Sequence, residues 1–377
     1  MNFRVIALVI SLLCYDESCA ESFTIDFYGE SLEFHWQSVR ILKKPLDASE
    51  KSLRRFYNEI SSRNDEQILH FLSNSKRRLV LNDWLYYELI GKVSNAIADR
   101  KVTRAYLRWY LLASSGYKAS IIFEKANAYV TVESSEAVHG FPKSRRGYCL
   151  DCPSVAKSYI PSRFNPFPRN KIDFSFAFSA LPTFSKDELL KKKFILSKID
   201  GSKDTFEAKF SPKLISCLEK WGNRNLKQTF LTPLSEGTKA IIQEFEVILR
   251  GQNDSSKIEY ITDFVRQNSI YESDESVGGN ASRWLTPEEF LFYDSGDCED
   301  RCSFLYYALK EILDKPLIIL TYQNHVNLAI SLELNSPCNF YYKDLPYYII
   351  EPTSRVSDPI PLGKYVLRPN EKFQVIE

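Results

Sequence analysis

Helical spacing of apolar residues dominates the first third of the chain. Between 47 and 114, apolar residues recur three and four positions apart, which predicts amphipathic helices. Ser115-Gly116 ends the last of these helices, and the runs 120–123 and 128–132 then predict two strands. The alternating run from Phe23 to Phe27 predicts an earlier strand that ends near Gly29.

A proline-rich stretch marks a change of pattern in the middle of the chain. Pro161, Pro166 and Pro168 predict a linker. Beyond it come three predicted strands separated by polar turns, 172–181, 194–199 and 206–210. Helical spacing then returns at 214–221, 238–249 and 257–267.

The C-terminal part carries the sharpest local signals. Thr286-Pro287-Glu288-Glu289 is a capping box with proline at the first helical position, so it predicts the start of a short helix. A second helix is predicted to start at Asp297 or Cys298. A strand is predicted to begin at His325, and the next strand to end at Glu351, just before Pro352.

These patterns predict an α+β fold and four segments. They are a signal peptide over 1–20, a mostly helical N-terminal module over 21–160, a β-rich middle module over 161–235 and a C-terminal domain over 236–377. The signal peptide is indicated by Arg4, the apolar run Val5 to Cys14 and the small-residue site Ser18-Cys19-Ala20. The mature protein is therefore expected to be exported and to have no integral membrane segment.

Charge argues against a nucleic-acid partner. The formal net charge is +1, and the basic clusters are short and scattered. We therefore predict no binding of nucleic acid, and the sequence leaves the oligomeric state open.

Cys298 is the candidate nucleophile. At the start of a helix, unpaired backbone N–H groups and the helix dipole favour a thiolate and lower the cysteine pKa. Asp297, Glu299 and Asp300 oppose this, because neighbouring negative charge raises a thiol pKa. The conflict is reduced if Asp297 caps the helix, Asp300 pairs with Arg301 or another base, and Glu299 faces solvent.

His325 and Glu351 are the candidate base and orienting group. A neutral imidazole takes the thiol proton, and a carboxylate on the other ring nitrogen fixes its tautomer. Each residue also has a plain structural explanation: His325 as a polar residue at a strand start, and Glu351 as a strand-end carboxylate beside a proline. Asn324 and Asn327, on either side of His325, are explained equally well as turn residues.

The frame GDCED…H…EPT, formed by Cys298, His325 and Glu351 in that order, resembles the transglutaminase-like superfamily. The resemblance is to bacterial transglutaminase-like cysteine peptidases and related envelope proteins, and the segment Tyr271-x-x-Asp274 adds to it. It implies a papain-like C-terminal domain and thiol acyl transfer through a Cys-His-Glu triad. The family usually has aspartate at the position of Glu351.

The resemblance also implies a substrate class and a location. The expected substrates are protein, peptide or peptidoglycan-type amides in the periplasm or outside the cell, at the bacterial cell envelope, and no cofactor is needed. The backbone N–H of Cys298 is an oxyanion candidate, with Gln267 or Trp284 as possible side-chain donors. The competing hypothesis is a non-catalytic binding or scaffold protein that keeps the fold.

The remaining cysteines favour structural explanations. Cys149 and Cys152 form a CxxC for which a disulfide, to each other or to Cys217 or Cys338, is preferred over redox or metal chemistry. Cys302, one helical turn after Cys298, is interpreted as a small buried residue rather than a second redox or zinc-binding thiol. No metal site is predicted.

A weak internal repeat is also visible. With a constant offset of 200, the segment YKASIIFEKANAYVTVE overlays the one ending IILTYQNHVNLAISLE and places Lys125 on His325 and Asn127 on Asn327. This indicates either a degenerate second copy of one fold unit or chance similarity of two helix-strand-strand segments.

Overall fold

The chain folds into two compact units, Met1–Ser175 and Phe176–Glu377, in the computed structural model. The structure describes residues 21–36, 45–62, 66–136, 141–153, 159–185, 188–221, 225–272, 284–367 and 372–377. The predicted signal peptide over 1–20 and Asp274 of the resemblance lie outside these residues. Within the described residues, no helix combines the length and the apolar character that crossing a membrane requires.

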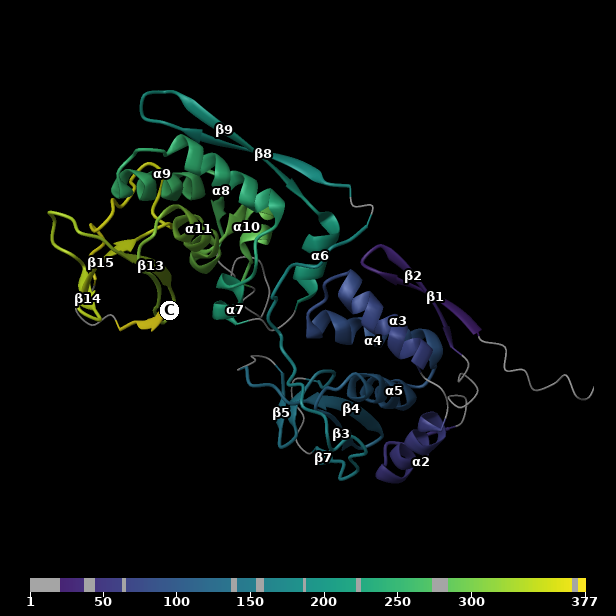
Figure 1. Cartoon of the computed structure of the whole chain (residues 1–377). Coiled ribbons are helices and arrows are strands. Elements are labelled where there is room, and N and C mark those ends of the chain that lie inside the picture. The colour runs from purple at the N-terminus through teal and green to yellow at the C-terminus, as the bar shows by residue number, and fades with distance from the viewer. Residues whose placement is uncertain are drawn as a thin grey trace, which may run out of the picture. The chain divides into compact units, whose positions relative to one another are not determined.

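The described residues of the first unit form a hairpin, four helices and a five-stranded sheet (Figure 1). The hairpin is β1 (Glu21–Phe27) and β2 (Glu30–Trp36). The helices are α2 (Glu50–Ser61), α3 (Glu66–Arg78), α4 (Asp83–Ile97) and α5 (Lys101–Ser114). The sheet strands are β3 (Ala119–Glu124), β4 (Asn127–Val132), β5 (Lys143–Ser144), β6 (Gly147–Cys149) and β7 (Ile160–Pro161), in the order β5-β6-β4-β3-β7.

The second unit begins with the hairpin of β8 (Leu190–Ser197) and β9 (Lys203–Phe210). Its helices are α6 (Pro212–Lys220), α7 (Leu226–Phe230), α8 (Glu236–Ile248), α9 (Asp254–Gln267), α10 (Pro287–Tyr293) and α11 (Cys298–Ile312). A short parallel pair joins β10 (Ile270–Tyr271) to β11 (Ser295–Gly296). The main sheet has the order β14-β15-β13-β12-β16, from β12 (Leu317–Thr321), β13 (Val326–Ser331), β14 (Phe340–Tyr342), β15 (Leu345–Ile350) and β16 (Gln374–Ile376).

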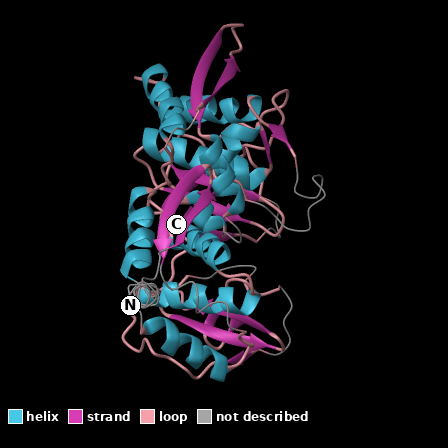
Figure 2. Cartoon of the chain, turned by 90° about the vertical axis from the view of Figure 1, so that its right-hand side faces the viewer, coloured by secondary structure: helices cyan, strands magenta, loops and turns pink. Residues whose placement is uncertain are grey.

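The two units share one topology. In each, a two-stranded hairpin is followed by helices and then by one helix leading into a five-stranded antiparallel sheet, so that β3 to β7 correspond in order to β12 to β16. The hairpin packs alike in both, with α3 on β2 and α4 on β1 in the first unit and α8 on β9 and α9 on β8 in the second. In both units the helices lie beside strands, as the cyan and magenta elements of Figure 2 show. The repeated order of elements supports a second copy over chance similarity.

Polar residues begin most of the helices. Ser211, Ser235 and Asn253 have extended backbones and accept a hydrogen bond from the backbone N–H three residues later. At α10, Thr286 and Glu289 form the capping box that the sequence predicts, since the Thr286 hydroxyl accepts from Glu289 N–H and the Glu289 carboxylate accepts from Thr286 N–H.

The core of the second unit extends from the β8–β9 hairpin to α11. Phe264 on α9 is fully buried, and its ring contacts the rings of Phe194, Phe206, Phe245 and Phe304 at centroid distances of 5.7, 5.1, 4.9 and 5.9 Å. These residues come from the hairpin and from α8 and α11. Because the hairpin alternates buried and exposed residues, its buried face needs these helices to cover it.

The predicted module boundaries differ from this architecture. The middle module over 161–235 is not separate, because its strands β8 and β9 share one core with α11. The strands predicted near 194–199 and 206–210 are confirmed, whereas 172–181 forms only an isolated bridge between Ile172 and Tyr117. The N-terminal module is mixed α+β rather than mostly helical, since two short strands, β6 and β7, complete its sheet through long-range pairing.

The CxxC is a local disulfide between Cys149 and Cys152. This confirms the preferred interpretation and excludes a bridge from either residue to Cys217 or Cys338, which are free thiols. Cys298 and Cys302 are also free and buried, so they are not bridged to each other.

We predict that Phe264→Ala lowers the free energy of unfolding by about 3–5 kcal/mol, because truncating a fully buried ring leaves a cavity among four other aromatic side chains. Urea unfolding followed by circular dichroism measures this. Tyr341→Ala is the control, since Tyr341 is 73% exposed and surface substitutions change stability by about 0.5 kcal/mol or less. Equal midpoints for both variants would contradict the assignment of Phe264 to the core.

Candidate active site

Three separate elements of the second unit bring Cys298, His325 and Glu351 to one place. Cys298 is the first residue of α11, His325 precedes β13, and Glu351 follows β15 directly. Strands β13 and β15 are antiparallel neighbours with Leu328 opposite Ile350, so the start of one lies beside the end of the other. Helix α11 packs against β13, where the Cys302 thiol donates to the Val326 carbonyl at 3.4 Å.

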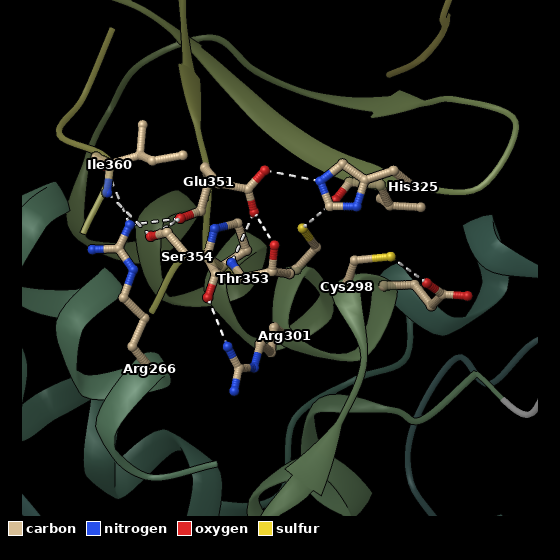
Figure 3. A network of polar contacts seen from close by, with 12 residues as sticks. Arg266, Cys298, Arg301, His325, Glu351, Thr353, Ser354 and Ile360 are labelled. Atoms are coloured by element: carbon tan, nitrogen blue, oxygen red, sulfur yellow. Dashed lines mark hydrogen bonds and ion pairs between the residues drawn. The ribbon is translucent and has the colours of Figure 1, made fainter. Parts of the chain in front are cut away.

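The imidazole of His325 is hydrogen-bonded to the carboxylate of Glu351. His325 Nε2 lies 2.8 Å from Glu351 Oε2. The other ring nitrogen of His325 is Nδ1. Figure 3 shows the second ring nitrogen on the side of the imidazole that faces the Cys298 sulfur. The longer side chain of glutamate, compared with aspartate, therefore still reaches the histidine.

Glu351 is a buried carboxylate whose two oxygens are both satisfied. Oε1 accepts from the backbone N–H of Thr353 at 2.8 Å and from the Thr353 hydroxyl, while Oε2 contacts His325. Burial acts to raise the pKa of Glu351, but the hydrogen bonds and charge of His325 and the bonds from Thr353 outweigh it, so the pKa is lowered. The carboxylate is thus ionised at neutral pH, as an orienting group requires.

Asn327 joins the same network, a role that the sequence left open. With its amide oriented to match its acceptors, the nitrogen lies 3.0 Å from Glu351 Oε2 and 2.9 Å from the Val326 carbonyl. The residue is fully buried, so its amide adds a second donor to the carboxylate that holds His325. The signal available in the sequence was its position two residues after His325, since residues two apart on a strand share a face.

Two buried arginines hold the chain that follows Glu351 (Figure 3). Arg266 Nη2 donates to the Glu351 carbonyl at 2.6 Å, and Arg301 Nη1 donates to the Pro352 carbonyl at 3.0 Å. Arg301 Nη2 also donates to the Ser269 carbonyl at 2.8 Å. Arg301 thus binds backbone carbonyls, which ties α11 to the end of β15, so the condition that Asp300 pairs with Arg301 is not met.

Asp300 instead organises the start of α11. Its Oδ1 accepts from Leu285 N–H at 2.6 Å, and its Oδ2 accepts from Asp297 N–H at 3.2 Å. A Cβ added at Gly296 would lie 2.8 Å from the Asp300 Cβ and Oδ2, closer than real contacts allow. Glycine at 296 and aspartate at 300 are therefore required together, which gives the GDCED motif a structural role.

The electrostatics around the thiol differ from the expectation of a lowered pKa. Burial raises the pKa of Cys298, and Glu299 and Asp297 raise it further, whereas the backbone of Val326 acts in the opposite direction. Glu299 does not simply face solvent: its Oε2 accepts from the Cys298 thiol at 2.8 Å. Cys298 is thus held as a neutral thiol, because the helix dipole does not offset burial and two neighbouring carboxylates.

The two side-chain candidates for oxyanion donors, Gln267 and Trp284, lie in different surroundings. Gln267 is engaged elsewhere, because its amide accepts from Ser197 N–H at 2.9 Å and donates to the Ser197 carbonyl at 3.1 Å. It is therefore not an oxyanion donor in this structure. Trp284 is half-buried and directly precedes Leu285, which is bound to Asp300, so it remains a candidate together with the backbone N–H of Cys298.

One group of possible metal ligands exists among the described residues at this site. Ligand atoms of Asp297, Cys298 and Glu299 lie within 4.8 Å of one another. A metal there would bind the sulfur that is placed next to the imidazole, so it would compete with nucleophilic use of the thiol.

The first unit lacks two of the three site residues at the corresponding positions. The last pair before the turn that joins β3 to β4 is Glu124 and Asn127. The last pair before the turn that joins β12 to β13 is Tyr322 and His325, where Tyr322 N–H donates to the His325 carbonyl at 2.8 Å. Asn127 therefore corresponds to His325. The constant offset of 200, which placed Lys125 at that position, is wrong by two residues. Continuing the strand pairing places Asp151 at the position of Glu351, and no cysteine lies at the start of α5.

Asp151 has a structural role in the first unit. Its Oδ2 accepts from Arg108 Nη1 at 2.9 Å and from the Tyr87 hydroxyl. The first unit thus keeps the carboxylate but has neither the thiol nor the imidazole of the second unit.

No protein-family model matches this chain, and no curated protein matches it.

We predict that Glu299→Gln speeds alkylation of Cys298 by iodoacetamide at pH 8 by about three- to tenfold, because removing the adjacent negative charge lowers the thiol pKa and raises the thiolate fraction. Mass spectrometry of the Cys298 peptide over time measures the rate. Glu311→Gln, at the other end of the same helix and exposed, is the control. An unchanged or lower rate for Glu299→Gln would contradict the assigned role of Glu299.

Proposed function

We propose that this protein is an exported thiol hydrolase of transglutaminase-like, papain-like type, a peptidase or amidase acting on cell-envelope amides. The observation that carries the proposal is the 2.8 Å contact between His325 Nε2 and Glu351 Oε2, beside the start of β13, where the cysteine-bearing end of α11 packs. The order of these residues in GDCED…H…EPT supports it as well.

The chemistry follows from the state of the thiol. Because Cys298 is neutral, no thiolate exists before the substrate is attacked. His325 Nδ1 takes the thiol proton as the sulfur attacks the amide carbonyl carbon. The carbon–sulfur bond forms, and the imidazolium then protonates the amine as the carbon–nitrogen bond breaks. Glu351 stabilises the imidazolium and fixes the ring throughout.

The second half of the reaction regenerates the thiol. His325 removes a proton from water, the oxygen attacks the thioester carbon, and the carbon–sulfur bond breaks. The proton then passes to the Cys298 sulfur, and a carboxylic acid is released. An amine in place of water would make the same site a cross-linking transferase. Apart from the substrate and the attacking water or amine, every group in these steps is a side chain of the protein.

A non-catalytic binding protein with the same fold is the second candidate function. The hydrogen bond from the Cys298 thiol to Glu299 favours it, because it opposes formation of the thiolate. A scaffold would keep the buried Arg301 and Asp300 contacts, since they hold the fold, but would have no need of the His325–Glu351 pair.

We predict that the wild-type protein hydrolyses peptide or peptidoglycan-fragment amides and that Cys298→Ala abolishes turnover, because it removes the nucleophile. A panel of amide substrates analysed by chromatography and mass spectrometry tests activity and substrate class together. Cys338→Ala is the control, since Cys338 is a free thiol outside the triad. Absence of turnover across the panel, or equal turnover by Cys298→Ala, would favour the scaffold.

Glu351→Gln is predicted to lower kcat by about 10²–10⁴-fold. The carboxylate stabilises the imidazolium and selects the Nε2–H tautomer, and a neutral amide in its place does neither. Steady-state kinetics on the best substrate of the panel provide the measurement. Glu333→Gln, an exposed residue just after β13, should retain wild-type kcat. A loss of less than about threefold for Glu351→Gln would mean that the carboxylate does not serve the histidine.

A further inference from the structure

Among the described residues, the outer edge of β2 in the first unit has no partner strand. Tyr28 and Gly29 have φ of 53° and 75°, which makes a two-residue turn closed by Phe27 and Glu30. Hydrogen-bonded and non-hydrogen-bonded pairs alternate from that closing pair. The backbone groups of Ser31, Glu33 and His35 therefore point away from β1, and among the described residues β2 pairs with no other strand.

A groove runs along this open edge. It has a volume of about 720 Å³ and lies between β2 and α3, which pack against each other (Figure 1). Its β2 wall consists of five consecutive residues, Ser31 to His35. Because successive side chains of a strand point to opposite faces, a cavity that touches all five follows the edge of the strand rather than one face.

The groove combines an apolar floor with a basic rim. Phe34 and Phe71 are in ring contact at 5.1 Å, and Leu32 lies on the same strand face as Phe34. The α3 wall ends in two exposed cations, Arg77 and Arg78, whereas Glu33 is the acidic residue among those lining the groove. The excess of cationic groups attracts a negatively charged ligand.

We propose that this groove binds an extended acidic peptide segment, which adds to β2 as a third strand. The open backbone groups of Ser31, Glu33 and His35 provide hydrogen bonds for such strand addition. Five residues at about 3.3 Å each give roughly 17 Å of edge, enough for a segment of about five residues. Alternate side chains of the peptide then point to Phe34 and Phe71, and acidic ones lie near Arg77 and Arg78.

The proposal goes beyond hydrolysis at Cys298 and does not depend on it. The groove belongs to the unit that has asparagine at the position of His325 and no cysteine at the start of α5. This unit would contribute recognition of a peptide rather than chemistry on it.

Fluorescence anisotropy with the full chain carrying Cys298→Ala tests the proposal, because this variant binds without turnover. The probe is a fluorescein-labelled peptide of alternating glutamate and valine, six residues long, and its counterpart replaces every glutamate with lysine. We expect saturable binding of the acidic peptide, weakened at 500 mM NaCl, and at least about tenfold weaker binding of the lysine peptide.

Two variants locate the site. Glu33→Pro removes an outward N–H without breaking the ladder to β1, and we expect it to weaken binding at least about tenfold. Thr24→Pro is its matched control, since Thr24 lies opposite Glu33 and its N–H points to the other edge. Arg77→Glu with Arg78→Glu should weaken binding similarly, and Lys51→Glu with Arg55→Glu, on exposed positions of α2, should not.

Hydrogen exchange gives a readout that does not require a variant to fold. The amides of Ser31, Glu33 and His35 should exchange more slowly when the acidic peptide is bound. The proposal is overturned if the acidic peptide does not bind, if Thr24→Pro weakens binding as much as Glu33→Pro, or if the lysine peptide binds equally well. It is also overturned if the free protein is a dimer in which these amides are already protected, since a second copy then occupies the edge.

Discussion

The hydrogen-bond ladder between β13 and β15 is the constraint on which the site depends. It places the residue before one strand beside the residue after the other, so His325 and Glu351 meet at 2.8 Å. Arg266 and Arg301 then fix the chain beyond Glu351 through backbone carbonyls, and Arg301 belongs to the helix that begins with Cys298. The three functional groups are therefore positioned by paired strands and one packed helix, the rigid elements of the unit.

The electrostatics of the site set Glu351 and Cys298 of the proposed triad apart. Hydrogen bonds from His325 and Thr353 keep the pKa of Glu351 low despite burial, whereas burial and neighbouring carboxylates keep the pKa of Cys298 high. A fixed carboxylate and a neutral thiol suit proton transfer through the imidazole during attack. The acidic residues around Cys298 have different roles. Asp300 accepts hydrogen bonds from backbone N–H groups, whereas Glu299 accepts one from the thiol.

The sequence predicted the local features of the second unit well, because its caps and strand ends are marked by single residues. The starts of α10 and α11 and the positions of His325 and Glu351 at strand ends agree with the prediction. Long-range features were not predictable in the same way. The β8–β9 hairpin looked like a separate module because its partner, Phe264, lies far along the chain. The contacts of Gln267 and Arg301 were not predictable for the same reason. Nothing near Gln267 in the sequence marks Ser197 as its partner, and nothing near Arg301 marks Pro352 as a contact. The sequence also indicated the internal repeat. Which residues of the two copies correspond depends on the turn lengths, and only the strand pairing shows these.

Two units of one topology thus differ in what they present: a thiol, imidazole and carboxylate in one, and a carboxylate with a groove along β2 in the other. Acyl transfer through Cys298, assisted by His325, can be followed by intact-protein mass spectrometry after incubation with an activated acyl ester. We expect a single acyl adduct on Cys298 that hydroxylamine releases, that is absent in Cys298→Ala and that forms at least about a hundredfold more slowly in His325→Ala. Equal acylation of Cys217, Cys298 and Cys338, or an unchanged rate in His325→Ala, would contradict it.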